Sequence, residues 1–391
     1  MTVFFNTGLT QQQFLTQYWQ KKPLLIRQAW EQIDAVLNAD ELAGLACEQD
    51  VESRLIQEYG ENGPWQVLHG PFTEADFTSL PETHWTLLVQ DVDKHVPQLA
   101  DIMTKFNFIP DWRRDDLMVS YAPEGGSVGP HTDGYDVFLL QAQGTRRWQI
   151  SQEPLSEAEF IDGLDLKILN TFEADDEWEL QPGDMLYLPP HFAHHGVALN
   201  NCMTFSIGFR APTQLELLDA FMHSLMAHET GQLRYRDPGL QVCDDDKYID
   251  IAALRRFKQS LLNCIEHADE VLMDAVGRLL TETKPSLELL ADELISDSED
   301  FSLSEHFAQG EQLQRNPYIR VAWSENDDNI QLFAAGESFK ADKASRAVIT
   351  LLTGAEPIQA SQWQQIQAAQ ATALLQDLIS IGCWHWQTEE L

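Results

Sequence analysis

The stretch Gly129-Pro-His-Thr-Asp-Gly-Tyr-Asp-Val-Phe-Leu-Leu140 decides how this chain of 391 residues is interpreted. In an extended segment, residues two apart point to the same side, so His131 and Asp133 can share a face while Thr132 points away. A His-x-Asp pair alone is weak evidence of a metal site, because histidines on strands are more often hydrogen-bonded structural residues. A further ligand is needed.

That ligand is predicted in Gly183-Asp-Met-Leu-Tyr-Leu-Pro-Pro-His-Phe-Ala-His194. The segment predicts a tight turn, an apolar strand from Met185 to Leu188, and a stop at Pro189-Pro190, because proline cannot donate to a sheet ladder. Two imidazoles and one carboxylate on a β-rich scaffold form the facial triad that binds Fe(II) and leaves positions open for a cosubstrate and O2. We therefore predict an iron site formed by His131, Asp133 and His194.

Three histidines compete for the last ligand position. In β-barrels that carry such a metal site, the position of His191 is usually the glycine of a Pro-x-Gly turn. His195 points opposite to His194 if the chain stays extended. His194 is favoured because a ligand must share its face with His131 and Asp133. The alternative is a surface histidine cluster that binds no metal.

A strand beginning at Gly144-Thr-Arg-Arg-Trp148 adds a basic residue to this site. On that strand Arg146 and Trp148 face one side and Arg147 the other. A buried arginine needs an anion, and its planar guanidinium binds a carboxylate through two hydrogen bonds. Arg146 is predicted to anchor the distal carboxylate of 2-oxoglutarate while the 2-oxo acid end chelates iron. A surface salt bridge is the alternative.

These motifs resemble those of the Jumonji-C ribosomal oxygenases, most of all the bacterial ribosomal-protein arginine hydroxylases. The resemblance rests on residues 121–141, the Gly-Thr-Arg-Arg-Trp strand and Pro-Gly-Asp-Met-Leu-Tyr-Leu-Pro-Pro. Residues 14–27 and 206–213 also resemble that family, so the likeness covers the first 230 residues and is weaker beyond them. It implies that His131, Asp133 and His194 are the iron ligands, that Arg146 binds the 2-oxoglutarate carboxylate, and that Ser120 is a second donor to it. His195 departs from the family pattern, in which an acidic residue is expected there.

The resemblance also implies an activity, the hydroxylation at carbon 3 of an arginine of large-subunit ribosomal protein sixteen. For an arginine target, an acidic group near the mouth should hold the guanidinium so that a methylene faces the iron. Glu124 and Asp136 are the candidates, with Tyr135 available for stacking. A histidine hydroxylase or demethylase of the same family, or a non-catalytic scaffold, are the alternatives.

Hydrophobic periodicity predicts an α+β protein. Many short β patterns with Gly and Pro turns, between Leu24 and Phe209, indicate a barrel or sandwich, which the resemblance specifies as a double-stranded β-helix (jelly-roll, cupin). Capping boxes predict helices opening at Thr10 and Thr213. The predicted domains are a catalytic domain over residues 1–212, a helical dimerisation region and linker over 213–300, and a winged-helix-like domain over 301–391.

The helical region carries three consecutive amphipathic patterns, over residues 217–225, 251–265 and 271–279. A stripe of this kind predicts burial against a second copy of the chain, and core packing within one chain is the alternative. Residues 292–300 predict a polar linker. In the last domain, residues 318–323 and 330–334 predict a hairpin, 344–352 and 373–379 predict helices, and Trp384-His-Trp386 predicts a short strand.

The net charge of −37 bears on the partners. A chain this acidic repels phosphate backbones and attracts basic polymers, so we expect a basic ribosomal protein as partner and no direct nucleic-acid binding. Solubility or salt adaptation is the alternative reason for the charge. From Ser302 onward there are five Lys and Arg against eleven Asp and Glu, so the winged-helix-like domain is predicted to dock protein or to be structural.

Composition predicts a cytoplasmic protein. There is no apolar stretch near the eighteen residues needed to cross a bilayer, and the first residues lack the basic flank of a signal peptide. The five cysteines are scattered and lack Cys-x-x-Cys spacing. They are expected to be free thiols in a reducing compartment.

Overall fold

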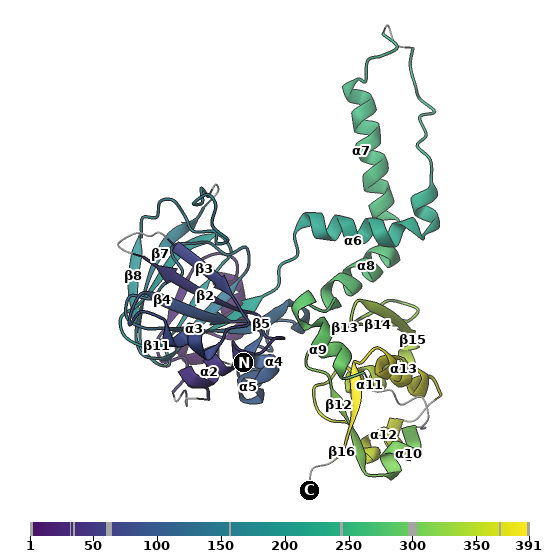
Figure 1. Cartoon of the computed structure of the whole chain (residues 1–391). Coiled ribbons are helices and arrows are strands. Elements are labelled where there is room, and N and C mark those ends of the chain that lie inside the picture. The colour runs from purple at the N-terminus through teal and green to yellow at the C-terminus, as the bar shows by residue number, and fades with distance from the viewer. Residues whose placement is uncertain are drawn as a thin grey trace. The chain divides into compact units, whose positions relative to one another are not determined.

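The computed structural model describes residues 3–31, 33, 36–59, 65–155, 158–242, 245–295, 303–366 and 369–388. The chain forms two compact units, Met1–Ala211 and Pro212–Leu391 (Figure 1). Of the predicted polar linker, residues 296–300 lie outside the described residues. Its first residues belong to helix α9 (Glu288–Glu293).

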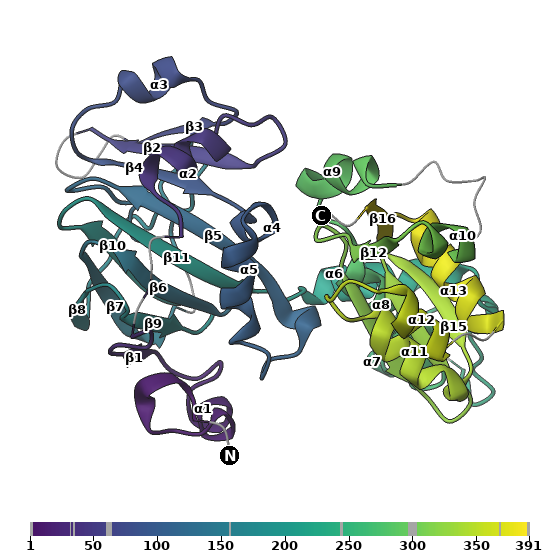
Figure 2. The same ribbon diagram turned by 90° about the horizontal axis from the view of Figure 1, so that it is seen from below.

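The first unit is built on two antiparallel sheets, which form the predicted double-stranded β-helix (Figures 1 and 2). The larger has eight strands in the order β1-β9-β6-β11-β5-β4-β2-β3, and the smaller has the order β10-β7-β8. The strands are β1 Leu24–Ile26, β2 Ser53–Glu58, β3 Trp65–His69, β4 Trp85–Val89, β5 Arg114–Ala122, β6 Val137–Gln143, β7 Arg146–Pro154, β8 Asp176–Leu180, β9 Met185–Leu188, β10 Phe192–Ala198 and β11 Cys202–Phe209.

The two faces of the large sheet bury different kinds of side chain. Because side chains alternate along a strand, Phe138 and Leu140 of β6 lie in one hydrophobic cluster, and Val137 and Leu139 lie in another. Along β9, Met185 and Tyr187 lie in the first cluster, and Leu186 and Leu188 lie in the second. The first cluster is the main core of the unit, and the second lies on the face that also lines the cavity described below.

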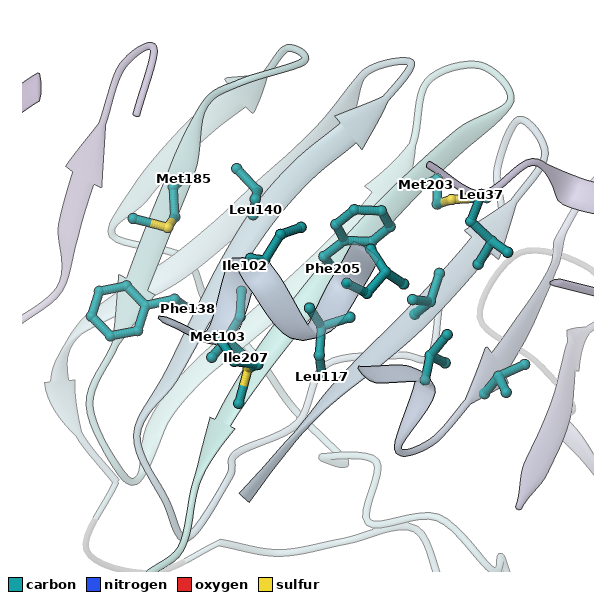
Figure 3. Packing of buried hydrophobic residues seen from close by; sticks show 14 of the residues in the cluster. Leu37, Ile102, Met103, Leu117, Phe138, Leu140, Met185, Met203, Phe205 and Ile207 are labelled. Atoms are coloured by element: carbon teal, nitrogen blue, oxygen red, sulfur yellow. The ribbon is translucent and has the colours of Figure 1, made fainter. Parts of the chain in front are cut away.

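Helices supply the other half of the main core. Helix α5 (Pro97–Thr104) places Ile102 and Met103 over Leu117, Phe205 and Ile207 of the sheet, as Figure 3 shows. The remaining helices of the unit are α1 Gln11–Gln17, α2 Ala39–Leu45, α3 Glu74–Thr78 and α4 Val92–His95. The predicted capping box of α1 is present: the Thr10 hydroxyl accepts from the Gln13 backbone N–H, and the Gln13 side chain accepts from the Thr10 N–H.

One strand of the smaller sheet was missing from the sequence prediction. We expected the chain to leave the sheet after Pro189-Pro190, yet it returns as β10 and pairs with β7 from His194 to Ala198. Neighbouring histidines and a glycine are not typical of a strand. Gly196 is required at this place because a Cβ there would lie 2.7 Å from ring atoms of Trp148.

The second unit contains helices followed by a small α+β domain. Its helices are α6 Gln214–Met226, α7 Ile251–Glu266, α8 Asp269–Thr281, α9, α10 Leu303–Ala308, α11 Arg346–Leu352, α12 Ala360–Ile366 and α13 Ala369–Ser380. Strands β13 (Val321–Glu325), β14 (Ile330–Ala334) and β15 (Glu337–Ala341) form one sheet, and β12 (Glu311–Arg315) pairs with β16 (Trp384–Thr388). The predicted hairpin, helices and closing strand are all present.

The three amphipathic helices do not use their apolar faces in the same way. Helix α8 packs within the chain: its Gly277 contacts Phe333, and Arg278 donates to the Gly336 carbonyl at 3.1 Å. No residue of α7 is buried. Exposed apolar side chains along α6 and α7 are Leu215, Leu218, Met222, Met226, Ile251, Leu254, Phe257, Leu261 and Leu262. Packing within one chain therefore accounts for α8 and for the side of α6 that carries Phe221, which is buried against Val271 and Ala275 of α8, whereas α7 stays largely uncovered.

No helix in the described part of the chain has the length and apolar character needed to span a membrane.

Two helix glycines should respond oppositely to alanine. Gly277→Ala in α8 would place a Cβ 2.3 Å from the ring of Phe333, which is 1% exposed, and should lower the free energy of unfolding by about 1–3 kcal/mol. Gly44→Ala in α2 meets nothing within 4 Å and should raise it by up to about 1 kcal/mol. Thermal unfolding of both variants measures this. Equal effects would contradict the packing of α8 on β14.

Candidate metal centre

The three predicted metal ligands come together through backbone pairing. The N–H of His131 donates to the His194 carbonyl at 3.0 Å, and the N–H of His194 donates to the His131 carbonyl at 3.0 Å. Ligand atoms of His131, Asp133 and His194 lie within 4.8 Å of one another. The extended segment assumed at His131 and Asp133 forms one isolated bridge and no ladder, and the regular strand β6 begins at Val137.

Each histidine is fixed in the same orientation by its own turn. The Nδ1 atom of His131 lies 2.9 Å from the Gly129 carbonyl oxygen, and that of His194 lies 2.9 Å from the Phe192 carbonyl oxygen. A carbonyl can only accept, so Nδ1 carries the proton in both rings. Both Nε2 lone pairs are therefore directed to the site, and Nε2 of His194 lies 3.5 Å from the Asp133 carboxylate.

The electrostatics keep the inner histidine neutral. Burial, reinforced by the neighbouring His131, lowers the pKa of His194 to about 4. A metal binds the unprotonated imidazole, so His194 is in its binding form at neutral pH. Two imidazoles and one carboxylate match the donor set of a non-haem iron site with open positions.

The two competing histidines face elsewhere. His191 has a φ of 68°, the left-handed conformation that favours glycine, and its side chain is exposed. Its N–H donates to the Asp133 carbonyl at 2.7 Å, so its role is to hold the backbone beside a ligand. The ring of His195 lies 3.0 Å from the Ser127 hydroxyl. Neither residue belongs to the described cluster of possible ligands.

A cavity of about 510 Å³ opens beside the triad and is lined by residues of both sheets. It contains His131, Asp133 and His194 together with Arg146 and Ser120. Arg146 is 3% exposed, and its Nε and Nη2 atoms are buried with no hydrogen-bond partner among the described residues. Trp148 also lies in the cavity wall, and its indole Nε1 is likewise buried with no hydrogen-bond partner among the described residues.

Buried donors that have no protein partner are typical of an anion-binding site. An unsatisfied buried polar group costs about 1–3 kcal/mol, and more for a charged group, so native proteins rarely keep one. A carboxylate would accept from both free nitrogens of Arg146. Ser120, 2% exposed, makes only a long 3.4 Å contact with the Thr204 carbonyl and can donate to the same ligand. The residues present thus fit a dicarboxylate bound beside a metal.

The three residues predicted for substrate lie in different places. Tyr135 lines the cavity and is 43% exposed, and the Asp133 carboxylate raises its pKa, so the phenol stays protonated. Glu124 lies in an exposed turn outside the cavity wall.

The prediction for Asp136 is wrong, because this carboxylate is 0% exposed and points into the core of the unit. It accepts from the Tyr187 hydroxyl at 2.6 Å, from Gln20 at 2.9 Å and from Arg113 at 3.2 Å. Burial raises the pKa of Asp136, an effect that these three donors oppose. Asp136 therefore anchors the chain between the metal ligands and β6.

Sequence reasoning missed one wall of the cavity. The long connection between β7 and β8 contributes Leu164, Asp165, Leu166, Lys167 and Ile168. Its length and its recurring apolar residues were the available signal, because a connection of this size is usually functional.

Comparisons with known proteins identify the family. The JmjC domain model matches residues 101–217, and the ROXA-like winged helix model matches residues 262–385. The Escherichia coli (strain K12) ribosomal protein uL16 3-hydroxylase is 35% identical over 96% of this chain and 97% of its own length. A probable ribosomal oxygenase of Haemophilus influenzae is 34% identical over 84% of this chain and 82% of its own length.

Solved structures of the E. coli ribosomal oxygenase YcfD match over the same range. One aligns with a TM-score of 0.80 at 33% identity, covering 97% of this chain and 98% of that one. Another, a complex with cobalt and 2-oxoglutarate, aligns with a TM-score of 0.78 at 32% identity over the same shares. The chain belongs to the Jumonji-C ribosomal oxygenases.

Proposed function

We propose that this protein is an Fe(II)- and 2-oxoglutarate-dependent oxygenase that hydroxylates carbon 3 of an arginine in ribosomal protein uL16. One observation supports the cosubstrate above all: the buried guanidinium of Arg146 has free donors in the cavity that also contains the metal triad. The relative named for uL16 supports the substrate. The protein would act in the cytoplasm.

Different residues of this chain would bind the metal and the cosubstrate. His131, Asp133 and His194 would hold iron, which supplies the oxidative chemistry when it is bound with 2-oxoglutarate and O2. Arg146 and Ser120 would fix the distal carboxylate and so orient the 2-oxo acid toward the open metal positions. The bridge between His131 and His194 holds the ligands before the metal binds, so little reorganisation is needed.

The reaction can be tested on purified uL16. The wild-type protein with Fe(II), 2-oxoglutarate and O2 should add one oxygen atom to an arginine and form succinate in equal amount. His194→Ala should abolish this because a ligand is lost, whereas His195→Ala should retain activity because its ring faces Ser127. Fragment mass spectrometry locates the oxygen. Modification of a histidine, loss of a methyl group, or no succinate would contradict the proposal.

The cosubstrate role of Arg146 has a matched control on the same strand. Arg146→Ala should weaken 2-oxoglutarate binding to the metal-loaded protein about tenfold or more, because a charged pair of hydrogen bonds is lost. Arg147→Ala removes the same charge from a residue outside the cavity wall and should change the Kd by less than about twofold. Isothermal titration gives both values. An equal loss of affinity in both variants would mean that positive charge on this strand, and not the position of Arg146 in the cavity, binds 2-oxoglutarate.

The exposed apolar side chains of α6 and α7 support a second part of the proposal, a homodimer. Apolar area of this extent is uncommon on a monomer, and a twofold arrangement covers it with a second copy of the same face.

Replacing Leu254, which is 65% exposed on α7, by Glu should therefore raise the dissociation constant of the dimer strongly. Leu289→Glu is the control, because Leu289 is 68% exposed on α9, outside α6 and α7. Sedimentation velocity at several concentrations separates the two variants. A wild-type monomer at micromolar concentration would rule out the dimer.

A further inference from the structure

The cavity contains one carboxylate that the metal site does not use. Among the described residues that line it, the acids are Asp133 and Asp165. Asp133 belongs to the metal triad, and the acids first expected at the mouth, Glu124 and Asp136, are absent from the wall. A cationic substrate side chain entering this cavity therefore meets Asp165 as the carboxylate that is not a predicted metal ligand.

The connection that carries Asp165 is fixed to the metal-ligand segment. The N–H of Ile161 donates to the Ile168 carbonyl at 2.8 Å, which closes a short loop with Asp165 between its ends. The N–H of Leu169 donates to the Pro130 carbonyl at 2.8 Å, one residue before His131. Ile168 also packs so closely on Gly129 that a Cβ there would lie 2.9 Å from it. The position of Asp165 is thus coupled to that of the ligands.

The wall around Asp165 suits the shape of an arginine side chain. Leu164, Leu166 and Ile168 of the same connection line the cavity with apolar groups, and Tyr135 adds an aromatic ring. Three methylenes can lie on apolar surface while the guanidinium at their end reaches a carboxylate. A planar guanidinium can donate two parallel hydrogen bonds to that carboxylate.

Asp165 is held in the substrate-free protein by a partner that can be displaced. Its carboxylate lies 2.8 Å from Nε2 of His69 on β3, and the two side chains are 79% and 55% exposed. Exposed pairs contribute little to stability, because water solvates both groups and screens them. A guanidinium always carries its charge, so it competes well against a histidine for the same oxygens.

We propose that Asp165 binds the guanidinium of the substrate arginine and releases His69 when it does so. This inference rests on the proposed function and specifies the residue that selects the substrate side chain. The apolar groups of the wall contact the methylenes, and the carboxylate fixes the far end of the side chain. The carbon to be oxidised is then set by the distance between Asp165 and the metal.

A pair of variants on the same loop tests it. Asp165→Asn removes the cavity carboxylate, and Asp162→Asn removes an exposed carboxylate three residues earlier that does not line the cavity. Binding of a uL16 peptide is measured by fluorescence anisotropy on protein loaded with Co(II) and 2-oxoglutarate. Asp165→Asn should weaken binding about tenfold or more, and Asp162→Asn by less than about twofold. His69→Gln should bind the peptide at least as tightly as wild type.

The same measurement on a peptide with citrulline at the target position shows whether Asp165 recognises the charge. Wild type should lose affinity for citrulline, and Asp165→Asn should bind both peptides equally. If wild type hydroxylates the arginine peptide but both variants lose affinity equally, or neither does, the role of Asp165 is overturned while the proposed function stands. If wild type neither binds nor modifies the arginine peptide, the proposed function fails.

Discussion

The pair of backbone hydrogen bonds between His131 and His194 is the constraint on which the site depends. It joins a segment that lies outside any regular strand to the start of the ladder between β10 and β7, and so places two imidazoles opposite each other with ring centroids 4.2 Å apart. The carbonyls of Gly129 and Phe192 then fix both tautomers. The ligand geometry is thus set by main-chain hydrogen bonding, which does not require a bound metal.

The double-stranded β-helix separates the stabilising core from the chemistry. Along the strands of the large sheet other than β3, alternate residues enter the helix-covered core, while their neighbours face the cavity or the smaller apolar cluster. Burying polar groups such as Ser120 and Ser206 on the cavity face costs little free energy once a polar ligand forms hydrogen bonds with them. Asp136 lies on the opposite side, where three donors make burial of a carboxylate tolerable.

Charge differs between the whole chain and the cavity. The chain has a net charge of −37, yet the cavity wall contains Arg54, Arg146 and Lys167. Local basic groups attract a dicarboxylate, whereas the acidic surface attracts a basic protein from further away. Screening limits the long-range attraction to about 8 Å at physiological salt, so recognition of one side chain must come from a group in the cavity wall. Asp165 is placed to provide it.

The sequence by itself predicted the metal and cosubstrate residues and most of the strands, with β10 as an exception. His131, Asp133, His194, Arg146 and Ser120 were predicted from spacing and family resemblance, because strand periodicity is local and motif residues lie close in sequence. Tertiary structure decided what depends on distant contacts. It paired His131 with His194, turned Asp136 into the core, and brought Asp165 of the β7–β8 connection to the cavity. Nothing local encodes these three outcomes, because each depends on which distant backbone segments satisfy one another's hydrogen bonds.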